Sequence, residues 1–143
     1  MIEVIRSADL SAPPGGVWAV LGEFGAISGW ADNVDHSCLM SDQAEGIGAV
    51  RRIQTGRTTV VERVVTWEPP SILTYSLEGL PPIVKSATNT WVVEATPTGS
   101  HLSLISRVDA GPGPAQRIVA TAIGRKLART SDVMLAGLKK TCS

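Results

Sequence analysis

The spacing of hydrophobic and polar residues changes twice along the chain. From residue 2 to residue 10 apolar and polar positions alternate weakly, which predicts a first strand. Between residues 17 and 30 apolar side chains recur at helical spacing, and Gly22 and Gly25 interrupt them. This pattern, preceded by a serine and two prolines suited to a helix start, predicts two short helices after the first strand.

From residue 34 onward the period falls to two, and turn residues separate the alternating segments. Six further strands are predicted, at residues 34–40, 49–55, 58–67, 72–77, 85–95 and 102–109. Residues 115 to about 140 contain no proline and carry one apolar stripe, which predicts a long amphipathic helix. Short connections favour an antiparallel meander, and the helix can bury its stripe only across that sheet. The sequence therefore predicts one α+β domain over residues 1–143.

The composition limits the possible partners. Thirteen basic and 13 acidic residues give a net charge of zero, which argues against a nucleic-acid partner. No apolar run approaches the ~20 residues of a membrane span, and the amino end lacks the pattern of a signal peptide. We therefore expect a cytoplasmic domain without integral membrane contact, as either a monomer or a homodimer.

The residues that could hold a metal or cofactor are too few and too scattered. The chain has two cysteines and two histidines, all distant from one another in sequence, and no glycine-rich phosphate loop. We predict no metal and no cofactor. Aromatic residues make up only 4% of the chain, so slender aliphatic side chains must fill the interior. A core of that kind can leave room for a ligand.

Five motifs, in their order along the chain, resemble one known family. The chain resembles the polyketide cyclase/dehydrase and lipid-transport branch of the START-like superfamily, also called Bet v 1-like or SRPBCC. The motifs are Val17-Trp18-Ala19-Val20-Leu21-Gly22-Glu23-Phe24, Trp30, Gly48-Ala49-Val50-Arg51, Val61-Glu62-Arg63-Val64 and Leu73-Thr74-Tyr75-Ser76-Leu77. The resemblance implies a helix-grip fold, in which a seven-stranded curved antiparallel sheet wraps around the long C-terminal helix. It also implies an internal cavity for a small hydrophobic ligand, but no particular reaction.

The hairpin over residues 49–66 carries the most informative pair of charges. A two-residue turn at Gly56-Arg57 would place Arg51 directly opposite Glu62. Alternation leaves two possibilities: an ion pair at the surface worth at most about 1 kcal/mol, or a buried polar anchor for a ligand. The resemblance implies the second, and deleting either charge should then weaken binding more than folding. Pairing with arginine should lower the pKa of Glu62, which disfavours a general base.

Strand parity and the resemblance together extend the list of cavity residues. The strand beginning at residue 85 is predicted to turn Ser86 inward and Trp91 outward. Trp30 matches a lid at the cavity mouth, although it could equally be a packing anchor. The remaining candidates, which could also be ordinary core residues, are Tyr75, Leu77, Val84, Leu104, Val119, Ile123 and Leu127.

Three functions compete on this basis. The first is a module that binds or carries a small hydrophobic or amphipathic molecule, lipid-like or polyketide-like, with no catalytic residue. The alternative is a polyketide cyclase or dehydratase that would use Glu62, Arg51, Tyr75 or His36 as acid/base or oxyanion partners. The third is a protein-interaction module, which would need an apolar patch outside the cavity such as an exposed Trp91.

Overall fold

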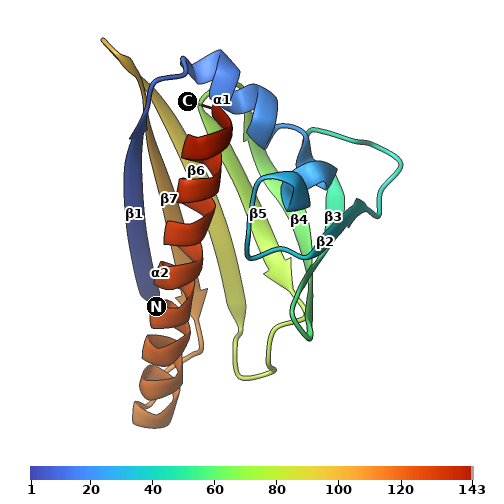
Figure 1. Ribbon diagram of the computed structural model, residues 1–143. Helices are drawn as coiled ribbons and strands as arrows, with labels where there is room; N and C mark the ends of the chain where they lie inside the picture. Colours follow the sequence, from blue (N-terminus) through green and yellow to red (C-terminus); the bar gives the residue numbers. More distant parts are fainter. Residues whose placement is uncertain (143) are drawn as a thin grey trace.

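Seven antiparallel strands form one curved sheet, and a long helix lies across its concave face (Figure 1). The computed structural model describes residues 1–142. Its elements are β1 (Ile2–Leu10), α1 (Pro14–Leu21), the 3-10 helix η1 (Phe24–Gly29), β2 (His36–Leu39), β3 (Val50–Thr55), β4 (Thr58–Glu68), β5 (Ile72–Glu78), β6 (Ser86–Thr96), β7 (Gly99–Asp109) and α2 (Pro114–Cys142). The predicted α+β helix-grip architecture is confirmed.

The order of strands in the sheet is β1-β7-β6-β5-β4-β3-β2. Strands β2 to β7 follow one another as hairpins, whereas β1 pairs with the last strand, so β1 and β2 are the two edges. The helices α1 and η1 connect these edges across the open side of the sheet (Figure 1). No helix within residues 1–142 is both long enough and apolar enough to cross a membrane.

The β3–β4 hairpin has the predicted register. Thr55 pairs with Thr58 and Arg51 pairs with Glu62. Gly56 occupies the first turn position with a φ of 62°, a conformation that glycine adopts at little cost. Arg57 keeps a negative φ, because only glycines have positive values among the described residues. This combination fits a type II′ turn, whose twist matches that of the strands.

Small residues of α2 bring the helix close to β1. Ala120, Gly124 and Ser131 are buried, and a β-carbon at Gly124 would lie 2.9 Å from the side chain of Ile2. Further along, Leu138 enters the core. The helix therefore packs on the sheet through its small residues, and the predicted apolar stripe is turned toward the space between helix and sheet.

The predicted parity of β6 is wrong. Asn89 and Trp91 are buried on the concave side, and Trp91 is only 1% exposed, while Ser86 is exposed on the opposite face. The prediction carried the inward orientation of Val84 into the strand. Because β6 begins only at Ser86, Val84 lies in the preceding loop and does not set the alternation. A buried Trp91 also removes the exposed patch that an interaction module would have used.

Candidate functional site

A cavity of about 280 Å³ lies between the concave face of the sheet and α2. Its wall comes from η1 and the loop after it, from β3 to β6, from the β5–β6 loop (residues 79–85) and from α2. Most of the wall is aliphatic, including Ile53, Val60 and Met134. Since an engineered cavity of about 150 Å³ holds benzene, this space suits a molecule of about two rings or a short acyl chain.

The structure brings five of the predicted site residues to this cavity. They come from four separate segments, the strands β4 and β5, the β5–β6 loop and the helix α2. These five are Glu62, Leu77, Val84, Ile123 and Leu127.

The other six predicted residues do not line the cavity. Four are buried in the core beside it, namely Arg51, Trp30, Tyr75 and Leu104. Val119 is half-buried on the first turns of α2, and Ser86 lies on the opposite face of the sheet. We therefore treat the four buried residues as supports of the site rather than as contacts for a ligand.

The partners of the Arg51 guanidinium are all groups of the protein. Its Nε donates a hydrogen bond of 2.7 Å to Oε1 of Glu62, and its Nη1 donates one of 2.9 Å to the carbonyl oxygen of Phe24. The guanidinium carbon lies 3.9 Å from the ring centre of Phe24 and 4.6 Å from that of Tyr75. Two cation–π contacts and a carboxylate thus surround this buried charge. Arg51 therefore positions Glu62 and does not itself reach the cavity.

Glu62 presents one free oxygen to the cavity. Its side chain is 3% exposed, and Arg51 binds only Oε1, so within residues 1–142 no hydrogen bond reaches the other oxygen. Burial raises the pKa of Glu62, and the Arg51 guanidinium offsets this only in part. The expectation of a lowered pKa is therefore wrong, because the cost of removing the carboxylate from water outweighs the nearby charge.

Polar residues of β5, β6 and β7 lie side by side on the concave face of the sheet. Tyr75 pairs with Asn89 and Asn89 pairs with Ser106 on three successive strands. Ser106 Oγ donates a 2.6 Å hydrogen bond to Asn89 Oδ1, and Trp91 Nε1 donates one of 3.2 Å to the Tyr75 hydroxyl. Of these four residues only Asn89 lines the cavity. The wrong parity of β6 hid it, although the apolar alternation that includes Trp91 indicated the correct face.

Two further polar residues of the wall were not predicted. Asn33, in the loop after η1, has a buried Oδ1 atom with no hydrogen-bond partner among the described residues. Loop positions show no periodicity, so no pattern in the sequence indicated it. Lys126 lies on α2, where its sequence context indicated only a solvated face. The cavity therefore combines an aliphatic wall with a few separated polar groups, as small-molecule sites do.

The phenol of Tyr75 provides a pH test of this arrangement. Burial and the neighbouring Glu62 raise the pKa of Tyr75 to about 12 from the ordinary tyrosine value of 10.0. As the pH rises, the unfolded chain loses its phenol proton before the folded protein does. The contribution of this group to the free energy of unfolding is therefore present below pH 10 and should be lost as the pH rises toward 12, by about 3 kcal/mol in total. Tyr75 is the only tyrosine, so phenolate absorbance reports it directly. Loss of the proton near pH 10 in the folded protein, or an equal decline in Tyr75→Phe, would contradict the prediction.

Comparison with known proteins gives a family and a fold. The family model described as polyketide cyclase/dehydrase and lipid transport matches residues 1–143. The structure resembles the Zhui aromatase/cyclase from Streptomyces sp. R1128, with a TM-score of 0.81 and 16% identity over 99% of this chain and 93% of that one. It also resembles the di-domain aromatase/cyclase StfQ of the steffimycin biosynthetic pathway, with a TM-score of 0.82 and 15% identity over 99% of this chain and 50% of that one.

A third similar structure comes from Thermobifida fusca, with a TM-score of 0.76 and 22% identity over 98% of this chain and 95% of that one. No curated protein matches the sequence. At these identities the structural likeness shows the fold alone.

Proposed function

Because the chain belongs to the polyketide cyclase/dehydrase and lipid transport family, we propose that its cavity binds or carries one small amphipathic molecule, lipid-like or polyketide-like. The observation that carries this proposal is the free oxygen of Glu62, which faces an otherwise largely aliphatic space. Burial of an ionisable group is costly, so an unpartnered oxygen at such a place favours a ligand that completes its hydrogen bonds.

The polar groups of the wall favour a ligand with hydrogen-bond donors. Glu62 has one oxygen without a hydrogen-bond partner among the described residues, and Asn33 and Asn89 add amide groups to the same wall. An unsatisfied buried acceptor costs about 1–3 kcal/mol, which a hydroxyl or amine of a ligand would recover. The aliphatic side chains around them would take the apolar part of the same molecule.

Native mass spectrometry of the protein purified from its own host tests the proposal most directly. We expect a discrete additional mass that disappears on denaturation, with a formula of the size that 280 Å³ admits. A protein that shows no additional mass, and that also fails to bind the neutral two-ring fluorescent probe 1-aminonaphthalene, would contradict it.

Filling the cavity should abolish binding without loss of stability. Leu77 lines the cavity, so Leu77→Trp is expected to occupy much of the space and to reduce probe fluorescence at saturation by at least tenfold. Ser76 is the matched control, because it neighbours Leu77 in β5 and its side chain points to the opposite face. Thermal unfolding should confirm that both variants fold. Equal probe binding by Leu77→Trp and Ser76→Trp would place the ligand elsewhere.

A second candidate function rests on the raised pKa of Glu62. A carboxyl with a raised pKa at a cavity wall suits proton transfer, which is what cyclisation and dehydration of a polyketide require. Tyr75 is less suited, because its hydroxyl lies behind the wall and accepts a hydrogen bond from Trp91. Incubation with a poly-β-carbonyl thioester, compared with the same compound without protein, separates the two functions. A carrier leaves the rate of conversion unchanged, whereas an enzyme accelerates formation of a cyclic isomer of the same mass or, after dehydration, of a product lighter by one water.

A further inference from the structure

The two charged residues of the cavity wall lie at different depths. Glu62 is the only acid among the lining residues, and its side chain is 3% exposed. Lys126 is the only base among them, and it is exposed on α2. The cavity therefore has an acid at its buried end and a cation at its open end.

Two further cations are next in the chain to residues that line the cavity. Arg57 lies in the β3–β4 turn between Thr55 and Thr58, which both line the cavity, and Lys85 follows the lining residue Val84. No ion pair joins Arg57, Lys85 or Lys126 to an acid within residues 1–142. We call these three residues the cationic rim.

Three acids in neighbouring segments have partners outside the cationic rim. Asp35 accepts a 2.7 Å hydrogen bond from the backbone of Gly56, and Asp109 accepts one of 2.9 Å from the backbone of Gly111. Glu78 pairs with Arg63 of β4. The rim cations are therefore not held in place by any of these acids.

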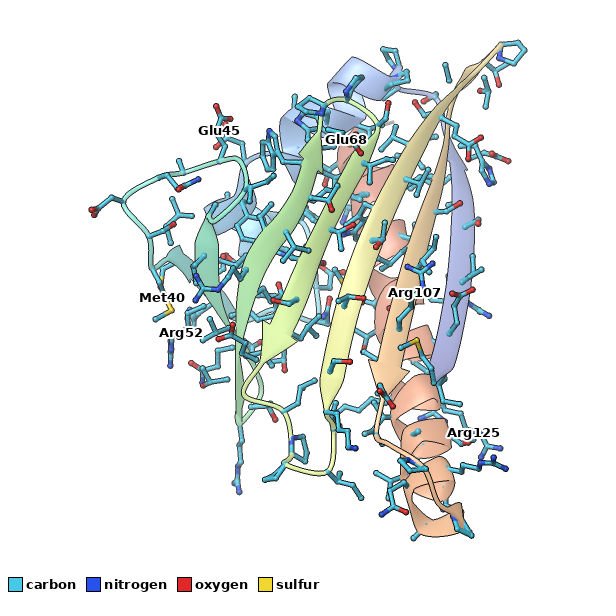
Figure 2. The ribbon with its side chains drawn as sticks, turned by 180° about the vertical axis from the view of Figure 1, so that it is seen from behind. Met40, Glu45, Arg52, Glu68, Arg107 and Arg125 are labelled. Carbon is cyan, nitrogen blue, oxygen red and sulfur yellow. The ribbon has the colours of Figure 1, made fainter. Side chains whose placement is uncertain are left out.

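One more cation lies next to Lys126 in the chain. Arg125 neighbours Lys126 on α2, and Figure 2 shows Arg125 toward the end of the molecule away from Glu45 and Glu68.

We infer that the cationic rim binds the anionic end of the ligand, a phosphate or a carboxylate, while the apolar part with its hydrogen-bond donor lies in the cavity. This inference rests on the proposed function and adds to it the polarity and the orientation of the ligand. Glu62 disfavours an anion at the buried end, because like charges repel strongly where water is excluded. Lys126 offers the opposite charge at the open end, where a phosphate can stay partly hydrated.

A pair of ligands that share an octyl chain, one with a phosphate group and one with a hydroxyl, tests the inference by titration calorimetry. Octyl phosphate is expected to bind the wild-type protein at least tenfold more tightly than 1-octanol, and its affinity should fall as salt is added. Lys126→Glu and the milder Lys126→Gln should bring the ratio of the two affinities toward one. Arg52→Glu is the matched control, because it also replaces a positive charge with a negative one. Arg52 is exposed on β3, and as the neighbour of Arg51 it points to the opposite face of the sheet, away from the cavity.

Each outcome has a separate meaning. Equal binding of octyl phosphate and 1-octanol, or an equal loss in Arg52→Glu and Lys126→Glu, overturns the inference and leaves the proposed function standing. Binding of neither compound, with no binding of 1-aminonaphthalene, refutes the proposed function itself. Sedimentation with phosphatidylglycerol vesicles, against phosphatidylcholine vesicles, identifies the source of the anion. Binding to the anionic vesicles without binding of octyl phosphate would assign the rim to a membrane surface and overturn the inference.

Discussion

Replacing Glu62 with alanine is expected to lower the free energy of unfolding by about 3–5 kcal/mol, as measured by urea denaturation. The reason is the partner that the substitution leaves behind. Arg51 is 2% exposed and would keep its charge between the rings of Phe24 and Tyr75 without a carboxylate. Removing one member of a buried ion pair costs far more than the pair contributes.

A double replacement provides the control. Arg51→Met together with Glu62→Leu removes both charges and keeps similar volumes, so stability should return to within about 1 kcal/mol of the wild type. Ligand binding should not return, because the acceptor of Glu62 is gone. The sequence predicted that loss of Arg51 would weaken binding more than folding. Because Arg51 belongs to a buried ion pair and does not line the cavity, we now expect its loss to reduce stability more than binding. A Glu62→Ala protein as stable as the wild type would show that water reaches this pair.

Replacing Gly137 with alanine is expected to destabilise the fold by about 3 kcal/mol or more. At this position the backbone of α2 passes so close to the loop after η1 that a β-carbon would overlap the carbonyl oxygen of Trp30. A backbone atom cannot rotate away as a flexible side chain can, so the helix itself would have to move. Thermal unfolding measures the loss, and weaker binding of the fluorescent probe would report the displaced helix.

Gly15 in α1 is the control for this second substitution. No heavy atom lies within 4 Å of a β-carbon built there, so Gly15→Ala should stabilise the protein by about 0.5–1 kcal/mol through lower backbone entropy of the unfolded chain. Opposite signs for Gly137→Ala and Gly15→Ala would confirm the close packing of α2. Two stabilising substitutions would mean that α2 does not pack as closely as the structure shows.

The strands and the register of the β3–β4 hairpin were predictable from neighbouring residues in the sequence. Gly56-Arg57 allows one tight turn, and that turn alone determines which residue faces Glu62. The rotation of α2 was not predictable in the same way. Val119 belongs to the apolar stripe but stays half-buried, because Ala120 and Gly124 allow a closer approach to β1 than larger side chains would. Helical periodicity records which residues are apolar, and not how near two backbones can come.

The chemistry of the site depends on distances across the fold. The sequence indicated that Arg51 faces Glu62, but the direction of the pKa change of Glu62 follows from how completely both are removed from water. Asn33 is a candidate polar group of the site only because the fold buries its Oδ1 atom, which has no hydrogen-bond partner among the described residues. Burial of that kind results from elements that are far apart in the chain, so no local pattern contains it.

The pairing of β1 with β7 has a consequence for how the protein is made. Ile2 pairs with Val108, and α2 then packs against β1, so β1 leaves the ribosome long before the two elements that cover it, β7 and α2. Until those are synthesised, the meander from β2 onward has neither its β1 edge nor its covering helix. Contacts between such distant segments slow folding, and the unfinished chain exposes apolar surface in the meantime. The face that later borders the cavity is thus the face on which a nascent chain would need a chaperone.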